Sequence, residues 1–162
     1  MSQIRGSTGL GSKPDSGGSN TGSGKVYFHI FNGRKYCVGH SDNTITIEKV
    51  NDSPTPNTQA MWQMVRDGGN YTFKNRSTGS YIVLDDNIKT SSSTGDNSKW
   101  QIEPAMSLSI DECQIVKASD GTAKNVFAND NETLVLAAKK DSGDVTQQAD
   151  QLFRVVYAAG TD

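Results

Sequence analysis

Three short stretches of this chain decide its fold: Ala60-Met61-Trp62-Gln63-Met64, Ser98-Lys99-Trp100-Gln101-Ile102 and Gln151-Leu152-Phe153-Arg154-Val155. Each stretch places one large aromatic residue among polar and apolar neighbours, at the end of a run of strand-like segments. The aromatics are 38 and 53 residues apart, and recurrence at this scale is typical of proteins built from structural repeats. Three further stretches open the units and begin at Tyr27, Tyr71 and Cys113, 44 and 42 residues apart. The sequence therefore predicts three similar units.

Within the first unit, turn residues and alternation predict short strands. Asn32-Gly33 is a tight hairpin turn, because this dipeptide tolerates the positive φ that such turns require. Thr44–Val50 alternates apolar and polar residues, which is typical of a half-buried strand. Asn51–Thr58 contains two prolines and is therefore predicted to be a protruding loop.

The second and third units repeat this order. In the second, we expect strands over Tyr71–Asn75 and Ser80–Leu84, a turn at Asp85–Asn87 and a soluble loop over Ser91–Asn97 before the strand of Trp100. No segment has the periodicity of an amphipathic helix. About twelve short strands with turn residues between them predict an all-β barrel or sandwich.

The first 24 residues differ from the rest in composition. Thirteen of them are Gly or Ser, which leaves too little apolar surface to offset the entropy of ordering, so we expect a disordered arm at 1–24 and one folded domain at 25–162. The arm has no apolar run like that of a secretory signal, which predicts a cytoplasmic protein or one secreted by an unconventional route. No apolar stretch reaches the roughly 18–20 residues needed to insert into a membrane.

Charge and cysteine content narrow the possible partners and cofactors. A formal net charge of −2 gives no attraction to phosphate backbones, so we do not expect nucleic-acid binding. The two cysteines, Cys37 and Cys113, belong to no metal-binding pattern and are predicted to be buried free thiols. We expect neither a metal nor another cofactor, and the sequence leaves the oligomeric state open.

Catalysis is not expected. Cys37 and His40 are three residues apart, which in an extended strand directs them to opposite faces and prevents a thiolate–imidazole pair. The neighbouring Asp85 and Asp86 would also diverge in an extended segment. The three aromatics at the unit ends are instead predicted to converge near a threefold axis and fill a barrel interior.

Three four-stranded units, each with an aromatic on its last strand, resemble the β-trefoil, particularly the ricin-B-type family with its Gln-x-Trp repeats. Here the repeats are Gln59-Ala60-Met61-Trp62, Asn97-Ser98-Lys99-Trp100 and Asp150-Gln151-Leu152-Phe153. Only the third keeps the Gln, and it lacks the Trp. The segment from Asn70 to Tyr81 looks like the intracellular trefoil lectins and inhibitors of mushrooms. Met61–Arg66 with the following Gly-rich turn also resembles the fungal mycocypin protease inhibitors.

The ricin-B resemblance implies a sugar site in which an Asp after the second strand, a stacking aromatic and an Asn or Gln near the last strand contact the ligand. Only the second unit offers such polar groups; the candidate sugar-binding residues are Asp85, Asp86, Asn87 and Asn97. Val38-Gly39 and Phe127-Ala128 stand in place of that Asp in the other units, and no aromatic lies between Asp85 and Asn97. The expected function is a carbohydrate-binding module with at most one weak site for a glycan.

The resemblance to mycocypins implies an alternative, a protease inhibitor that acts through exposed loops. Preorganised loops lose little entropy on docking. The candidates are the Asn51–Thr58 loop and the residues Asn32, Gly33, Arg76, Lys139 and Lys140. Small residues would suit a papain-like cleft and basic ones a trypsin-like pocket. A cytoskeletal trefoil is a third possibility, although two histidines do not favour a pH-switched one.

Overall fold

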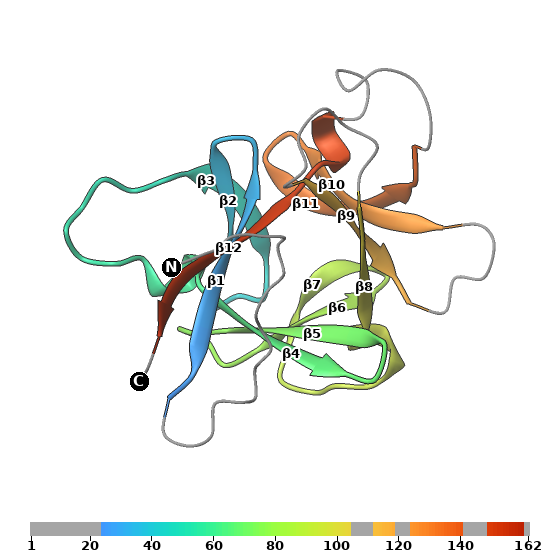
Figure 1. Ribbon diagram of the computed structural model, residues 1–162, viewed down its shortest axis with the longest axis horizontal. Coiled ribbons are helices and arrows are strands. Elements are labelled where there is room, and N and C mark those ends of the chain that lie inside the picture. The colour runs from blue at the N-terminus through green and yellow to red at the C-terminus, as the bar shows by residue number, and fades with distance from the viewer. Residues whose placement is uncertain (1–23, 105–111, 119–123, 141–148, 161–162) are drawn as a thin grey trace.

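The chain folds as an all-β protein. The computed structural model describes residues 24–104, 112–118, 124–140 and 149–160, so all but one residue of the expected arm lies outside the described part (Figure 1). The described residues form twelve strands, about the number that the sequence predicts, and these strands are joined in one continuous sheet. They are β1 (Val26–Asn32), β2 (Lys35–Gly39), β3 (Ile45–Lys49), β4 (Trp62–Asp67), β5 (Asn70–Asn75), β6 (Tyr81–Asp85), β7 (Asn87–Ser91), β8 (Trp100–Pro104), β9 (Cys113–Lys117), β10 (Asn125–Asp130), β11 (Thr133–Ala138) and β12 (Arg154–Gly160).

The pairing of these strands is that of a β-trefoil. Six of them close a barrel: β1 pairs with β4 and β12, β4 with β5, β5 with β8, and β8 with β9. A bridge between Cys113 and Phe153 joins β9 to the chain just before β12 and completes the ring. The hairpins β2–β3, β6–β7 and β10–β11 are the second and third strands of the three units (Figure 1).

A single 3-10 turn precedes the last strand of each unit. These turns are η2 (Thr58–Ala60), η3 (Asp96–Ser98) and η4 (Ala149–Gln151). Each ends on a buried small or amide side chain two residues before the aromatic: Ala60, Ser98 or Gln151. Among the described residues these turns are the only helical segments, and none has the length and apolar character needed to cross a membrane.

The registers of the strand pairs define equivalent positions in the three units. The last-strand aromatics pair with Phe28, Tyr71 and Cys113 of the first strands. The expected alignment on Tyr27 is therefore wrong by one residue. A difference of one residue exchanges the two faces of a strand, so Phe28 and not Tyr27 is the counterpart of Tyr71.

Equivalent positions build the core in layers. Three triplets are all buried: Ile30, Phe73 and Ile115 on the first strands; Cys37, Ile82 and Phe127 on the second; Ile45, Ile88 and Leu134 on the third. Each layer thus receives one side chain from every unit. This threefold supply of apolar groups explains how a chain with only 33% hydrophobic residues encloses a continuous core.

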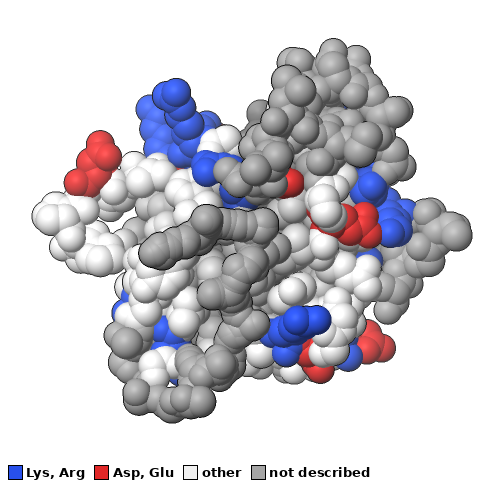
Figure 2. All heavy atoms as spheres, viewed as in Figure 1, with Lys and Arg blue, Asp and Glu red and all other residues white. Residues whose placement is uncertain are grey.

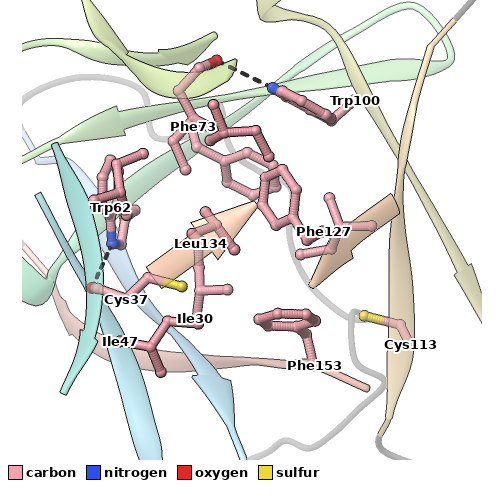
Figure 3. Packing of buried hydrophobic residues seen from close by; sticks show 14 residues of the cluster. Ile30, Cys37, Ile47, Trp62, Phe73, Trp100, Cys113, Phe127, Leu134 and Phe153 are labelled. Atoms are coloured by element: carbon pink, nitrogen blue, oxygen red, sulfur yellow. Dashed lines mark hydrogen bonds between the residues drawn. The ribbon is translucent and has the colours of Figure 1, made fainter. Parts of the chain in front are cut away.

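The three last-strand aromatics are fully buried, which confirms that they are core residues. They do not meet one another, however, and the expected convergence on the axis is wrong. Trp62 and Trp100 lie apart, with Phe73 and Phe127 between them, and Phe127 contacts both Trp100 and Phe153, with ring centroids 4.7 and 6.0 Å apart (Figure 3). Each indole Nε1–H donates to a second-strand carbonyl, that of Cys37 or Ile82, at 3.1 Å.

Two local expectations need correction. Asn32 pairs with Lys35, so it is the last residue of β1 and the turn consists of Gly33 and Arg34. The strand β7 is also not predicted from the sequence, because it has only one large apolar residue and little alternation of apolar and polar residues. Its Thr90 is buried among apolar side chains and donates from its amide and its hydroxyl to Asn43 of the first unit, at 3.0 and 3.3 Å.

The last residue of each first strand holds the 3-10 turn of the preceding unit. Asn32 donates to the carbonyls of Ala149 and Leu152 at 3.0 and 2.9 Å. The equivalent Asn75 donates to Gln59 at 2.8 Å. The third equivalent, Lys117, donates to Asp96 at 3.4 Å. These contacts lock neighbouring units together, and Asn32 closes the ring between the third unit and the first.

Candidate functional site

The polar tip of the β6–β7 hairpin brings three of the predicted site residues together. Asp85 ends β6, Asn87 begins β7 and pairs with Asp85, and Asp86 alone forms the turn between them. Asp86 has φ +64, a left-handed conformation that a short polar side chain tolerates better than an apolar one. All three side chains are exposed, so two carboxylates and an amide face solvent side by side.

The carboxylate of Asp85 is oriented by its own hairpin. Lys89, four residues further on in β7, places its Nζ 3.0 Å from Oδ2 of Asp85. The two side chains are 59% and 40% exposed, so the pair contributes only about 0–1 kcal/mol to stability. Its effect on the site is to limit the rotamers of the carboxylate, which remains accessible to a ligand.

Asn97 lies on a different element, at the other end of the hairpin. It is an exposed residue of η3, the turn that precedes Trp100 and packs against β6. Trp100 bonds to Ile82, three residues before Asp85. A strand rises about 3.3 Å per residue, so the tip extends roughly 10 Å beyond this anchor. Within the described residues no hydrogen bond joins Asn97 to the tip.

The described part of the second unit places no aromatic ring beside the hairpin tip. Tyr81 is its nearest candidate in sequence, but it pairs with Ser91 at the base of the hairpin, four residues from Asp85. The ammonium group of Lys74 also lies over the Tyr81 ring, 5.6 Å from its centroid. The tip can therefore recognise a ligand through hydrogen bonds and charge, without stacking from Tyr81.

The registers assign different equivalents to Asp85 than the sequence suggests. His40 occupies this position in the first unit and Asp130 in the third, not Val38-Gly39 and Phe127-Ala128. The turns after these positions differ in length from unit to unit, which is why the unaligned sequence misplaces them. The third unit therefore also carries a carboxylate here, a feature visible only through strand pairing.

In the first unit His40 belongs to a small hydrogen-bonded network. The hydroxyl of Thr46 donates to the carboxylate of Glu48. His40 Nε2 lies 2.7 Å from that hydroxyl and 3.1 Å from the carboxylate, so it is the donor to both. The imidazole therefore faces Thr46 and Glu48. Cys37, on the strand β2 that ends just before His40, lies in the core, which confirms that the two side chains diverge.

The small inhibitory-loop candidates are held by their own chain. Besides its two donated bonds, Asn32 accepts one from Asn129 Nδ2 at 3.0 Å. The carbonyl of Gly33 accepts from Arg154 at 3.1 Å, and Gly33 has φ +63. The side chain of Asn32 thus joins units, while the turn of Gly33 and Arg34 forms the hairpin tip.

The basic candidates also contact the protein surface. The guanidinium of Arg76 lies over the ring of Tyr27, 4.5 Å from its centroid. Lys139 is 18% exposed, with Nζ 3.7 Å from Glu103. Lys140 Nζ lies 3.1 Å from Asp150. Each of these contacts would have to break before the cation could enter the pocket of a protease.

The predicted proline loop is the most prominent projection of the described chain. Residues 51–56 are exposed, and the loop stands away from the barrel between β3 and η2 (Figure 1). Asn51 Oδ1 accepts from Ser53 N at 2.9 Å, and Ser53 Oγ accepts from Thr55 N at 3.1 Å. At the base, the amide of Asn51 donates to the hydroxyl of Tyr36 at 3.2 Å.

A second apolar cluster supports the base of this loop. It consists of Tyr36, Val38 and Ala60, with the partly buried Phe31 packed against them. The equivalents of Phe31 in the other units are Lys74 and Val116. The aromatic support is therefore specific to the unit that carries the projecting loop.

The cysteines are free and buried, as predicted. Burial raises the pKa of the Cys37 thiol far above its ordinary value. Burial, with a smaller effect of the Glu112 charge, raises the pKa of Cys113 to about 12. Both thiols are therefore protonated at neutral pH. Among the described residues, no group of three or more His, Cys, Asp or Glu side chains is arranged to hold a metal ion.

Charges are interspersed over the described surface. On the face shown in Figure 2, Lys and Arg alternate with Asp and Glu among large uncharged areas. This distribution agrees with the net charge of −2. Among the described residues on that face, no broad region of one sign is present to attract a strongly charged partner.

Comparison with known proteins supports the fold. No family model matches the chain, and no curated protein matches it. Among solved structures, it is similar to the GlcNAcα1-4Gal-releasing endo-β-galactosidase from Clostridium perfringens, with 12% identity, a TM-score of 0.66 and coverage of 83% of this chain and 33% of that one. It is also similar to ThreeFoil, a designed threefold-symmetric protein, with 17% identity and a TM-score of 0.56. The match covers 80% of this chain and 97% of ThreeFoil. The chain spans about a third of the clostridial enzyme's length. At these identities the likeness concerns the fold alone.

Proposed function

We propose that this protein is a non-enzymatic, ricin-B-like carbohydrate-binding module that uses the tip of the β6–β7 hairpin. The observation that carries the proposal is the exposed carboxylate of Asp85, held by Lys89 beside Asp86 and Asn87. Carboxylates and amides are suitable partners for vicinal sugar hydroxyls, because they accept and donate several directed hydrogen bonds. The similarity in fold to an endo-β-galactosidase is compatible with this proposal.

Each residue has a distinct role in this proposal. Asp85 accepts hydrogen bonds from one or two hydroxyls, and Asp86 and Asn87 contact the same sugar from the turn. Asn97, on the 3-10 turn η3 away from the tip, contacts a second residue of a longer glycan. Without a stacking ring the site is weak, on the order of millimolar, which corresponds to about −4 kcal/mol.

A glycan array followed by NMR titration of the selected glycan tests this function. Asp85→Ala should abolish binding, because it removes the main acceptor. Asp130→Ala is the matched control, since it changes the equivalent position of the third unit and should leave binding intact. A glycan that binds equally to wild type and Asp85→Ala, or binding lost only in Asp130→Ala, would refute the site.

The proline loop favours a second candidate function, protease inhibition. Its exposed residues are preorganised by successive turn hydrogen bonds and by two prolines, so docking into a cleft would cost little further entropy. A panel of cysteine and serine proteases, assayed with wild type and with a chain in which residues 52–56 are replaced by Gly and Ser, separates this candidate from the first. If the variant with the replaced loop no longer inhibits the protease and the wild type binds no glycan on the array, the protein is an inhibitor.

A further inference from the structure

The projecting loop contains every Ser-Pro or Thr-Pro pair of the chain. Ser53-Pro54 and Thr55-Pro56 follow each other directly, whereas the other two prolines come after Lys13 and Glu103. Both pairs fall in the exposed segment 51–56, outside the strands that form the barrel. A hydroxyl followed by proline is the feature that proline-directed kinases select. The loop therefore presents two Ser/Thr-Pro pairs at an exposed position that a kinase can reach.

The loop is also suited to enter a kinase cleft. A proline disfavours the helical region for the residue before it, which applies to Ser53 and Thr55 alike, although the segment 53–55 is bent in the free loop. The hydrogen bonds that shape the segment are exposed, and each runs from a backbone N–H to one side-chain oxygen. Ser53 N–H donates to Asn51 Oδ1, and Thr55 N–H donates to Ser53 Oγ. Breaking them exposes no core. An enzyme can therefore extend the segment without unfolding the trefoil.

The two hydroxyls differ in their surroundings. The oxygen of Ser53 already accepts the amide hydrogen of Thr55, at 3.1 Å, which occupies one lone pair and holds the side chain against its own loop. The hydroxyl of Thr55 makes no hydrogen bond within the described part of the chain. Its oxygen can therefore turn toward an incoming phosphoryl group. In the folded loop the hydroxyl of Thr55 is thus available without the loss of a hydrogen bond, unlike that of Ser53.

We propose that Thr55 is a phosphorylation site for a proline-directed serine/threonine kinase. In this reaction the Thr55 hydroxyl oxygen attacks the γ-phosphorus of magnesium-bound ATP. A new O–P bond forms, the bond from that phosphorus to the bridging oxygen of the β-phosphate breaks, and ADP leaves. The hydroxyl proton passes to the catalytic base of the kinase.

Phosphorylation would change the charge of the loop strongly. A phosphothreonine carries about −1.5 to −2 charges at neutral pH. Residues 50–58 contain Asp52 and no Lys or Arg, so nothing within the loop neutralises the added charge. A partner that docks on the unphosphorylated loop would be repelled or replaced by one with an arginine cluster. The inference is independent of sugar binding, since the loop and the hairpin tip belong to different units.

The test uses the full, folded chain with magnesium-ATP and a cyclin-dependent kinase, with phosphopeptide mass spectrometry as the readout. We expect one main phosphate, on Thr55. Thr55→Ala and Pro56→Ala should each remove at least nine tenths of the incorporation, whereas Ser53→Ala and Pro54→Ala should retain most of it. The exposed residues Ser92, Ser93 and Thr94 form a natural control, because their loop has no proline.

Three results would overturn the proposal. The first is an unmodified loop in the folded chain. The second is phosphate on residues 92–94 at a rate comparable to Thr55. The third is incorporation that persists in Pro56→Ala or lies mainly on Ser53. Circular dichroism of each variant confirms that the trefoil is intact, which is expected because every substitution lies on the exposed loop.

Discussion

At the scale of single residues, the trefoil depends on a few buried side chains that both fill space and satisfy a polar group. Trp62 and Trp100 are fully buried, and each indole N–H donates to a carbonyl of its own unit. Phe153 fills the third equivalent position without such a bond. The indoles therefore fasten the second strand of a unit to its fourth.

Replacing either tryptophan should be strongly destabilising. Trp62→Ala and Trp100→Ala each leave a cavity and an unpaired carbonyl, so we expect a loss of roughly 3–5 kcal/mol in urea unfolding. Tyr157→Ala is the control, since its side chain is 61% exposed and should lose far less. Similar small losses for all three would mean that the indoles are not core residues.

The first and second units pack closely together at Gly39. A Cβ atom at this position would lie 2.7 Å from Asn75 Nδ2 and 2.9 Å from Trp62. Gly39→Ala should therefore cost about 1–3 kcal/mol through overpacking. Gly69→Ala meets nothing within 4 Å and serves as the control. Thermal unfolding measures both, and equal melting temperatures for the two variants would contradict the packing described here.

At the scale of elements, the 3-10 turns connect the units. Each precedes a last strand and receives a hydrogen bond from the first strand of the next unit. For η4 the donor is Asn32, which lies 117 residues before Ala149 in the chain. Stability should therefore respond to these contacts even though they lie outside the regular sheet.

Loss of the Asn32 contact should loosen the third unit. Asn32→Ala leaves two carbonyls and the amide of Asn129 without this partner, which should cost about 1–3 kcal/mol. Asn97→Ala, an exposed change within η3, should be nearly neutral. Hydrogen exchange should show faster opening of β12 in the first variant only. Unchanged exchange in both would mean that the contact does not hold the units together.

The β2–β3 hairpin carries an electrostatic contact that predicts a pH dependence. Lys35 and Lys49 face each other across the strands, and Glu132 of the third unit pairs with Lys35. The hydrogen bond and charge of Lys35, helped by Lys49, lower the pKa of Glu132. A depressed folded pKa means that the stabilisation is present above the ordinary value of 4.5 and is lost as the pH falls through the lower one.

Glu132→Gln should therefore be less stable than wild type at pH 7 and equal to it once Glu132 is protonated at acidic pH. High salt should reduce the difference at pH 7, because the groups are exposed. Urea titrations between pH 2.5 and 7 measure it, and a difference that persists at the lowest pH would contradict the assigned cause.

At the scale of the whole molecule, the two thiols report on global opening. Both lie in the core and have raised pKa values, so neither reacts as a thiolate in the folded state. We expect almost no reaction with a disulfide reagent at pH 8 in native protein and two thiols in denaturant. The slow native rate should follow the unfolding rate. Rapid reaction of one thiol would show local access instead.

The sequence by itself determined the fold class and the three units. The recurrence of Trp62, Trp100 and Phe153, with turn residues between short alternating segments, is enough, because apolar spacing along a strand is a local property of the chain. Their burial and the proline loop after β3 were predictable for the same reason.

Only the tertiary structure decided which positions are equivalent and which side chains meet. Strand register depends on hydrogen bonds between segments far apart and on turns of unequal length, and a one-residue shift exchanges the faces of a strand. This is why Asp130 and His40 emerge as the counterparts of Asp85, and why Asn97 lies away from the tip. It is also why Asn32, a turn residue by its sequence, proves to join the last unit to the first across 120 residues.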